Sequence, residues 1–366
     1  MAEIQLQNLA HSYLDNPQQA QDYAIRQMNH VWRQGGAYAL LGPSGCGKST
    51  LLNIISGLLQ PSEGTILFDD KEVNHLSPDK RNIAQVFQFP IVYDSMTVYD
   101  NLAFPLRNLK YNKARIDEKV REVAEILDLE ASLNRRATNL SADEKQKVSM
   151  GRGLVRDDVS AILFDEPLTV IDPHLKWKLR RKLKQIHEKF NITMVYVTHD
   201  QLEASTFADQ IALMYQGQIV QFGTPQELFE NPAHTFVGYF IGSPGMNIIE
   251  VSLIDNALAF DKQTITLDSK TIDALNACQS DNIKVGIRPE FVELAREASS
   301  DTYCCSLDDV ENLGTYKILT LGLGHEKIKV RISEDESMPA DKVHIRFPKQ
   351  WLKIYVDEYL FKEQQA

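Results

Sequence analysis

The sequence has few cysteines, and their positions do not form a disulfide pattern. Four occur among 366 residues, at Cys46, Cys278, Cys304 and Cys305. Cys46 lies inside a glycine-rich segment, and neighbouring cysteines such as Cys304 and Cys305 rarely bridge each other. A disulfide-stapled scaffold is therefore excluded, and we expect reduced thiols in a cytosolic setting.

Long hydrophobic runs are also missing. No apolar stretch of the sequence approaches the roughly 18 residues that a membrane-spanning helix requires. No N-terminal signal pattern is present either. We therefore expect any role at a membrane to depend on partner subunits.

The sequence also lacks an excess of positive charge. Asp and Glu number 50 against 39 Lys and Arg, which gives a formal net charge of −11. This balance argues against a nucleic-acid-binding protein, which usually shows a basic excess. The main basic cluster comprises Lys176, Lys178, Arg180, Arg181, Lys182 and Lys184. It shares its segment with leucines at helical spacing, so we predict that it is the solvated face of an amphipathic helix.

What the sequence does contain is a phosphate-binding pattern. Residues 42–50 fit G-x-x-x-x-G-K-[ST], with an apolar run at 37–41 before them and a helical pattern after them. Glycines let backbone N–H groups surround phosphate oxygens, and a helix N-terminus adds a favourable dipole. In this pattern Lys48 reaches the β- and γ-phosphates, and Ser49 binds Mg²⁺.

A pair of carboxylates ends a second apolar run. Residues 161–164 are apolar and are followed directly by Asp165 and Glu166. Ligands bind at the carboxyl ends of strands in open α/β sheets. Taken alone, these acids fit a solvated strand end better, but together with the phosphate loop they indicate a functional site. Asp165 is expected to hold Mg²⁺ through water, and Glu166 to polarise the attacking water. His199 closes a further apolar run, at 192–198.

The hydrophobic period changes once along the chain. Residues 1–244 alternate short apolar runs with amphipathic helical patterns, as α/β domains do. After a break at 242–247 the period becomes two, for example over 328–332 and 343–347. We predict an ATP-binding α/β domain at 1–244 and a small all-β, barrel-like domain at 245–366.

Together these motifs resemble those of ABC transporter ATPases, and more narrowly those of the carbohydrate-importer group that includes the maltose-importer ATPase. The loop at 42–50 resembles the Walker A motif, and Asp165-Glu166 the Walker B motif. Gln88 matches the Q-loop glutamine, Asp172 the D-loop, and His199 the switch histidine. In the tail, 242–247 and 286–290 resemble the group's OB-like C-terminal domain, which has a regulatory or dimerisation role.

The resemblance implies ATP and Mg²⁺ as cofactors. Glu166, His199 and Gln88 are then the catalytic residues, and Ser49, Gln88 and Asp165 bind the metal. Tyr13 falls where the family stacks an aromatic ring on adenine, although strand packing and a rival, Tyr23, remain open alternatives. The full set of nucleotide-binding residues is Tyr13, Gly42, Pro43, Ser44, Gly45, Cys46, Gly47, Lys48, Ser49, Thr50 and Gln88.

The resemblance also implies an assembly. Two such domains pair head to tail and enclose two ATP molecules, each between one phosphate loop and the partner's signature loop. The expected partners are a second ABC ATPase subunit, two integral-membrane permease subunits and, indirectly, a solute-binding protein, with no nucleic acid. The chain would then sit at the cytoplasmic face of the inner or cell membrane, held there by the permeases.

One motif departs from the family. Its signature Leu-Ser-Gly-Gly-Gln is replaced by Leu140-Ser141-Ala142-Asp143-Glu144. A Cβ and two carboxylates crowd the approach of backbone amides to the partner's γ-phosphate, and a unit charge pair at 4 Å is worth about 4 kcal/mol at a dielectric near 20. We expect a heterodimer in which this loop forms the weaker site; the alternative is a tolerated variant in which backbone amides suffice.

Two other functional classes remain as alternatives. A soluble ABC ATPase of DNA repair or translation would need no membrane, but the acidic balance and the β tail disfavour it. A P-loop kinase would lack the combination of Gln88, the signature loop and His199. The solute is not recorded in these residues; the resemblance points to a sugar or a polyol, with glycerol as one candidate.

Overall fold

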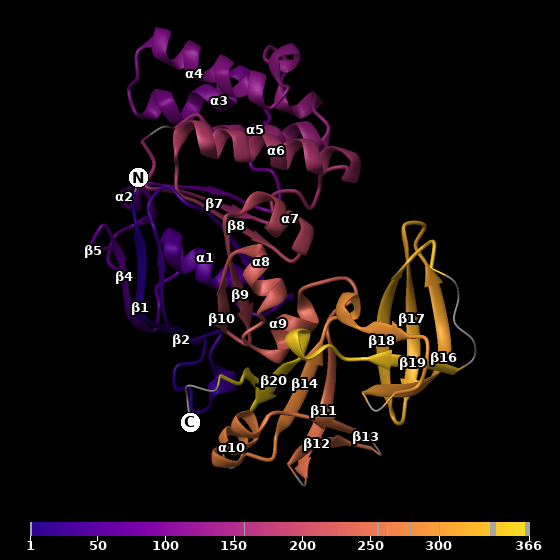
Figure 1. Cartoon of the computed structure of the whole chain (residues 1–366). Coiled ribbons are helices and arrows are strands. Elements are labelled where there is room, and N and C mark those ends of the chain that lie inside the picture. The colour runs from indigo at the N-terminus through magenta and orange to yellow at the C-terminus, as the bar shows by residue number, and fades with distance from the viewer. Residues whose placement is uncertain are drawn as a thin grey trace. The chain divides into compact units, whose positions relative to one another are not determined.

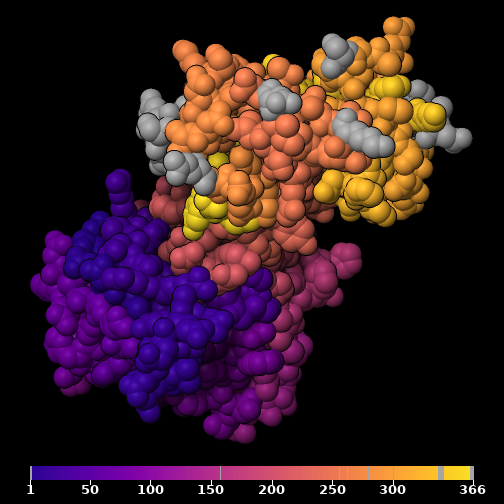
Figure 2. All heavy atoms as spheres, turned by 90° about the horizontal axis from the view of Figure 1, so that it is seen from below, coloured from indigo at the N-terminus to yellow at the C-terminus, as the bar shows by residue number. Residues whose placement is uncertain are grey.

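A computed structural model describes residues 2–156, 158–254, 256–261, 263–278, 280–299, 301–336 and 342–362, which are drawn in colour in Figure 2. The chain divides into two compact units, Met1–Pro225 and Gln226–Ala366. Each unit has its own core of buried aliphatic and aromatic side chains. The sequence predicts that residues 1–244 and 245–366 fold as separate domains, and this division stays a prediction.

A six-stranded sheet forms the centre of the N-terminal unit (Figure 1), in the order β10-β9-β3-β8-β7-β6. All neighbouring strands are parallel except β9 and β10. β3 and β8 are buried along their whole length, which explains their unbroken apolar runs. The strands are β3 (Ala37–Leu41), β6 (Ile83–Val86), β7 (Ala161–Asp165), β8 (Met194–Thr198), β9 (Gln210–Tyr215) and β10 (Gln218–Gly223).

An antiparallel sheet and seven α-helices complete this unit among its described residues. The sheet has the order β2-β1-β4-β5 and comprises β1 (Ile4–His11), β2 (Ile25–Trp32), β4 (Glu63–Phe68) and β5 (Lys71–Glu72). The helices are α1 (Lys48–Ser56), α2 (Pro78–Arg81), α3 (Val98–Asn108), α4 (Lys113–Ile126), α5 (Ala142–Leu154), α6 (Pro173–Phe190) and α7 (Gln201–Phe207). Among the described residues, no helix combines the length and apolarity that crossing a membrane would require.

The C-terminal unit is built mainly from two sheets. One has the order β13-β12-β11-β14-β20-β21 and the other β15-β19-β16-β17-β18. The side chain of Asn247 joins them, because it both accepts from the Lys329 N–H at 2.8 Å and donates to the Lys329 carbonyl at 2.9 Å. The strands are β11 (Asn247–Ile254), β12 (Ala257–Phe260), β13 (Gln263–Thr266), β14 (Ile283–Ile287), β15 (Glu293–Ala295), β16 (Thr302–Asn312), β17 (Tyr316–Leu323), β18 (Glu326–Ser333), β19 (Lys342–Arg346), β20 (Lys353–Val356) and β21 (Tyr359–Leu360).

Among the described residues, three α-helices accompany these sheets, namely α8 (Pro225–Glu230), α9 (Thr235–Phe240) and α10 (Ser269–Ala277). Arg288 connects α8 and α9 to β14. Its guanidinium, in a residue only 2% exposed, donates to the carbonyl oxygens of Phe229 and Ile241, each at 2.5 Å. Burial lowers the pKa of Arg288 to about 10. The tail segment 286–290 therefore contains a buried structural cation that ties helix ends to a strand.

The basic cluster on α6 differs from the prediction of a solvated face. Lys178 and Lys182 pair with Asp128 and face water in part, as expected. Arg180, however, is only 8% exposed, so the prediction is wrong for this residue. The periodicity of the sequence places it beside Leu179 and Leu183, but it cannot show how far α7 covers the arginine.

Candidate nucleotide site

Four predicted segments meet at one edge of the central sheet. The phosphate loop follows β3, Asp165 ends β7, and His199 follows β8. The strands are parallel neighbours, with Leu41 opposite Thr198 and Asp165 opposite Val197. Gln88 lies two residues beyond β6, the neighbour of β7. Because carboxyl ends of parallel strands share an edge, this topology gathers the predicted catalytic and phosphate-binding residues.

The phosphate loop needs its glycines for close approach to other backbone. Gly47 has φ +105°, and a Cβ there would lie 2.5 Å from the Ala24 carbonyl oxygen. A Cβ on Gly42 would collide with the Met214 carbonyl. Lys48 is 5% exposed and donates to the carbonyls of Gly42 at 2.8 Å and Pro43 at 2.9 Å. This ammonium on a glycine-rich loop at the start of α1 fits the phosphates of a nucleotide.

Asp165 and Ser49 form the candidate metal ligands. The Ser49 hydroxyl donates to Asp165 Oδ1 at 3.3 Å. Burial raises the pKa of Asp165, and the charge of Glu166 adds to it, while the Ser49 hydrogen bond opposes the rise. A divalent cation would relieve this burial cost. Within the described ranges no three His, Cys, Asp or Glu side chains cluster as a metal site, so Mg²⁺ would also need phosphate oxygens and water.

Glu166 and His199 face each other across the site. Glu166 Oε1 lies 3.1 Å from His199 Nδ1, and the Glu166 side chain is 19% exposed against 56% for His199. Glu166 has φ +45°, a left-handed conformation that costs a non-glycine residue energy and often marks a functional position. The Thr169 hydroxyl donates to the Glu166 carbonyl at 3.0 Å and fixes the turn after β7. A carboxylate and an imidazole at this distance can orient water and contact a phosphate.

The structure separates the two tyrosines that the sequence left open. The Tyr13 ring is 67% exposed, and its hydroxyl lies 3.1 Å from the Thr50 hydroxyl at the end of the phosphate loop. Tyr23 instead donates to Glu63 at 3.0 Å. Tyr13 therefore has an exposed aromatic face beside the phosphate loop, where an adenine ring could stack.

The altered signature loop forms the start of α5. Ser141 is its N-cap: the Ser141 hydroxyl accepts from the Glu144 N–H at 3.2 Å, and the Ser141 N–H donates to Glu144 Oε2 at 3.0 Å. Arg135 also pairs with Glu144 Oε1 at 2.8 Å, and Lys147 with Asp143 at 3.3 Å. Burial favours a higher pKa for Glu144, but the Ser141 N–H and the Arg135 charge outweigh it and lower the pKa.

These contacts change the reason for expecting a weak site. The carboxylates are already paired with cations, so their repulsion of a phosphate is smaller than two free charges would give. The capping box matters more, because the Ser141 N–H is bound within its own helix, whereas the Ser141 hydroxyl only accepts there and keeps its proton. A nucleotide would have to displace the Glu144 carboxylate to use the Ser141 N–H.

Sequence reasoning missed the part of Gln146 in the site. This fully buried residue on α5 donates to the carbonyls of Phe87, next to Gln88, at 3.1 Å and of Pro167, next to Glu166, at 2.9 Å. It therefore ties the signature helix to both catalytic segments. A glutamine on the apolar side of a helical pattern was the available signal. Asp172 has a local role, since its carboxylate caps α6 by accepting from the His174 N–H at 2.8 Å.

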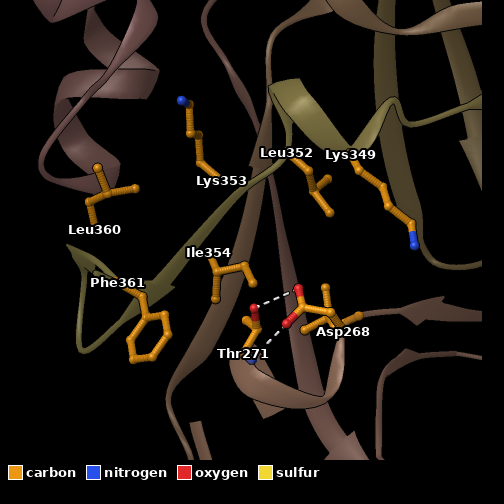
Figure 3. A pocket seen from close by; sticks show the side chains of 9 residues that line it. Asp268, Thr271, Lys349, Leu352, Lys353, Ile354, Leu360 and Phe361 are labelled. Atoms are coloured by element: carbon orange, nitrogen blue, oxygen red, sulfur yellow. Dashed lines mark hydrogen bonds between the residues drawn. The ribbon is translucent and has the colours of Figure 1, made fainter. Parts of the chain in front are cut away.

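A cavity of about 440 Å³ lies in the C-terminal unit, lined in part by Asp268, Thr271, Lys349 and Lys353 (Figure 3). The Asp268 carboxylate accepts from both the Thr271 hydroxyl and its N–H, and Lys353 donates to Asn231 at 2.9 Å. In Figure 3 the amines of Lys349 and Lys353 point away from each other. Most of the polar groups here already have partners, so the cavity has no evident chemistry in the nucleotide reaction.

Comparisons with known proteins give the family of the chain. The ABC transporter family model matches residues 25–169, and the MalK OB fold domain model matches 242–292. The chain is 38% identical over 346 residues to the sn-glycerol-3-phosphate import ATP-binding protein UgpC of Psychromonas ingrahamii, covering 90% of each chain. It is 40% identical over 327 residues to the trehalose import ATP-binding protein SugC of Mycobacterium tuberculosis, covering 87% of this chain and 81% of that one.

Solved structures show the same fold for the N-terminal part. CbiO1 of Clostridium perfringens, part of an ABC transporter complex, aligns with a TM-score of 0.56 at 27% identity, over 62% of this chain and 90% of that one. An ATP-binding cassette solved as a dimer in a post-hydrolysis state with ADP and Pi aligns with a TM-score of 0.53 at 29% identity, over 60% of this chain and 98% of that one. The expected fold, an ABC-type P-loop ATPase domain followed by an OB-like domain, is confirmed, with α10 as a helical addition to the β tail.

The trehalose/maltose import ATP-binding protein MalK of Thermococcus litoralis is similar over nearly the whole length as well, with 37% identity over 347 residues, 88% of this chain and 93% of that one. The similarity thus extends through both units and is not limited to the nucleotide-binding motifs. The chain belongs to the ATP-binding subunits of ABC importers, in the carbohydrate-uptake group, and it is an ATPase coupled to solute import.

Proposed function

We propose that this chain hydrolyses ATP with its own phosphate loop, Asp165, Glu166, His199 and Gln88. The observation that carries the assignment is the 3.1 Å approach of Glu166 to His199 beside the loop. Glu166 orients and deprotonates the attacking water, His199 contacts the γ-phosphate, and Lys48 neutralises the phosphate oxygens. Mg²⁺, held by Ser49 and Asp165 with Gln88 nearby, would stabilise the charge that develops on those oxygens.

Substitution of Glu166 tests this assignment. In the assembled complex, Glu166→Gln should retain ATP binding but lose ATP turnover by about 10²- to 10⁴-fold, the usual contribution of a general base. Glu118→Gln, on an exposed turn of α4, removes the same charge and should leave turnover unchanged. Turnover near that of the wild type in Glu166→Gln would refute the catalytic assignment.

The solute we propose is a sugar or a polyol, with glycerol and its phosphate among the candidates. The relatives are named for import of sn-glycerol-3-phosphate, trehalose and maltose, which share a polyhydroxylated character. The chain would work at the cytoplasmic face of the inner or cell membrane, with two permease subunits and, indirectly, a solute-binding protein. Isolation of the intact complex, followed by screening these solutes for stimulated ATPase activity, would identify the substrate; co-purification with ribosomes or DNA would contradict import.

We further propose that the second ATPase subunit is non-identical. The capping box formed by Ser141 and Glu144 supports this, because the Ser141 N–H, a donor of the loop that should serve the partner's nucleotide, is already bound to the Glu144 carboxylate. In a heterodimer, this chain's phosphate loop would face an intact signature, whereas a homodimer would carry two weak sites.

Restoring the signature tests the pairing. Replacing Ala142, Asp143 and Glu144 by Gly, Gly and Gln removes the capping carboxylate, so the ATPase rate of the isolated chain should rise. The comparison needs the wild-type chain alone, the restored chain alone, and the wild-type chain with its partner. A wild-type homodimer that hydrolyses ATP as fast as the full complex would disprove the heterodimer.

A further inference from the structure

A second cavity lies in the N-terminal unit, along one side of α6. Its volume is about 400 Å³, and its lining includes Trp177, Arg180, Arg181, Lys184 and Glu188 of α6 and Thr206 of α7. Figure 1 shows α6 and α7 near each other. None of these residues belongs to the proposed nucleotide site.

Arg180 is the residue that makes this cavity unusual. It is 8% exposed, and its buried Nε–H has no hydrogen-bond partner among the described residues. Its nearest carboxylate oxygen is Glu203 Oε1, 3.9 Å from Nη1, which is beyond hydrogen-bond length. Buried charges in proteins are nearly always paired and hydrogen-bonded, so an acceptor for this Nε–H is missing.

Glu203 is engaged mainly by other donors, and its Oε1 atom lies too far from Arg180 for a hydrogen bond. Its Oε2 atom accepts from the hydroxyls of Tyr196 and Thr198, each at 3.0 Å. Its Oε1 atom accepts from the Lys176 ammonium at 3.3 Å. The charge of Glu203 is therefore shared, and Arg180 retains a positive charge at the wall of the cavity.

The rest of the lining adds to this positive charge. Arg181 is exposed, and the Lys184 ammonium lies 3.7 Å from the Asp209 carboxylate, beyond hydrogen-bond length. Glu188 is the single acid among the lining residues. Trp177 contributes an indole ring that is 58% exposed. A small polar dianion with a short carbon skeleton matches such a wall, because guanidinium groups bind phosphate oxygens in pairs and the indole covers carbon.

Thr206, which is exposed, offers an acceptor to a hydrogen-bond donor on the ligand. Its hydroxyl proton is donated to the Leu202 carbonyl at 2.5 Å, which leaves the oxygen free to accept. A hydroxyl on the ligand could supply that donor. From this geometry we infer that the cavity beside α6 and α7 binds a small hydroxylated phosphate monoester, with its phosphate on Arg180, Arg181 and Lys184.

The test is a fluorescence titration of the full, nucleotide-free chain with glycerol 3-phosphate at constant ionic strength. Trp32 is fully buried and Trp351 stacks on Phe291, so Trp177 is the tryptophan placed to report on this cavity. We expect a saturable change in emission that disappears in Trp177→Phe. Three other compounds serve as comparison probes. Glycerol has no charged group, sulfate has no carbon skeleton, and succinate carries carboxylates in place of the phosphate. Each should bind at least about tenfold more weakly than glycerol 3-phosphate.

Charge variants on α6 distinguish a site from general attraction. Lys184→Gln and Arg181→Gln should each weaken binding several-fold, and Arg180→Gln by about tenfold or more. Lys182→Gln removes the same charge from the same helix, but at a lysine that pairs with Asp128, and should have no effect. The exposed positions 181 and 184 keep the test valid if the Arg180 variant does not fold.

The phosphate loop is the competing explanation, because it also attracts phosphates. Lys48→Ala should leave the Trp177 response intact. A response that is lost in Lys48→Ala but kept in the Arg181 and Lys184 variants would overturn the inference. So would an equal response to sulfate or succinate, or the lack of any saturable change with glycerol 3-phosphate.

Discussion

Two neighbouring carboxylates, Asp165 and Glu166, end the same strand but have different surroundings. Asp165 points to Ser49 and is buried enough to raise its pKa, while Glu166 lies against His199 in a left-handed backbone conformation. These surroundings assign the residues different tasks, metal binding for Asp165 and water activation for Glu166. Both residues hold conformations or charges that are costly without the nucleotide.

The cost at Asp165 can be measured. Its pKa is raised above the ordinary 3.8, chiefly by burial, so the folded chain binds this proton more tightly than the unfolded chain does. The contribution of this group to the free energy of unfolding therefore falls as the pH rises from the ordinary pKa through the raised pKa. At neutral pH the ionised carboxylate destabilises the fold. Asp165→Asn should raise the melting temperature of the nucleotide-free chain at pH 7, and the gain should shrink as pH falls toward the raised pKa.

With Mg-ATP bound, the wild-type chain should instead melt at a higher temperature than Asp165→Asn, because only the wild-type carboxylate binds the metal well. Asp117→Asn, on the exposed face of α4, is the matched control and should not show this pattern. A nucleotide-free Asp165→Asn chain that is less stable than the wild type at pH 7 would show that Asp165 stabilises the fold in its charged form.

The exposed ring of Tyr13 leads to a second prediction for a single residue. Stacking of a base on an aromatic side chain is worth about 1–3 kcal/mol, so Tyr13→Ala should weaken ATP binding by roughly tenfold. Tyr13→Phe keeps the ring and loses only the contact with Thr50, so it should bind almost as well as the wild type. Calorimetric titration with ATP gives both constants. If Tyr23→Ala weakens binding and Tyr13→Ala does not, then Tyr23 is the adenine partner.

Among the elements, α5 connects the signature loop to the catalytic segments, and two glycines lie within it. A Cβ on Gly151 would come within 2.5 Å of Leu102 on α3 and 3.1 Å of Leu127, so this glycine allows close packing of the two helices. A Cβ on Gly153 would meet Ala84 and Val86 only at 3.5 Å, an ordinary contact. The two glycines therefore have different reasons to be present.

Alanine at each glycine should change stability in opposite directions. Gly151→Ala overpacks the contact between α3 and α5 and should lower the free energy of unfolding by about 1–3 kcal/mol. Gly153→Ala gains helix propensity without a clash and should raise it by up to about 1 kcal/mol. Urea denaturation of both variants gives the comparison. Equal effects of the two substitutions would mean that α3 moves away at little cost.

The periodicity of the sequence was enough to locate most of these elements. The unbroken apolar runs at 37–41 and 161–164 became the buried strands β3 and β7, and the alternation over 328–332 became β18. The resemblance of the motifs to a known family supplied the order of the strands. That order brings Gln88, Asp165 and His199 to one edge of the sheet. The sequence could not predict the hydrogen-bond partners of single polar side chains, because these depend on contacts between residues far apart in the chain. Gln146 bonds to loops 59 and 21 positions away, and the guanidinium of Arg180 lies 3.9 Å from Glu203 on α7.

At the scale of the molecule, the question is where the ATP-binding part ends. The compact units meet at Pro225, whereas the change of period and the matched OB-type domain begin near Gly242. The difference lies in α8 and α9, whose carbonyls at Phe229 and Ile241 accept from Arg288 far along the chain. These helices belong energetically to the C-terminal unit, because a buried carbonyl without its donor costs about 1–3 kcal/mol.

Two truncated chains can locate the boundary. A chain that ends at Gly242 and one that ends at Thr224 both keep every residue of the nucleotide site, so both should bind ATP like the full chain. In the longer fragment α8 and α9 lack Arg288, and their amide hydrogens should exchange much faster than in the full chain. Hydrogen exchange followed by mass spectrometry measures this, and Arg288→Met in the full chain should increase exchange in the same two helices. If the Gly242 fragment is folded and soluble yet binds no ATP, then the nucleotide site depends on the C-terminal unit and the two-domain division is wrong.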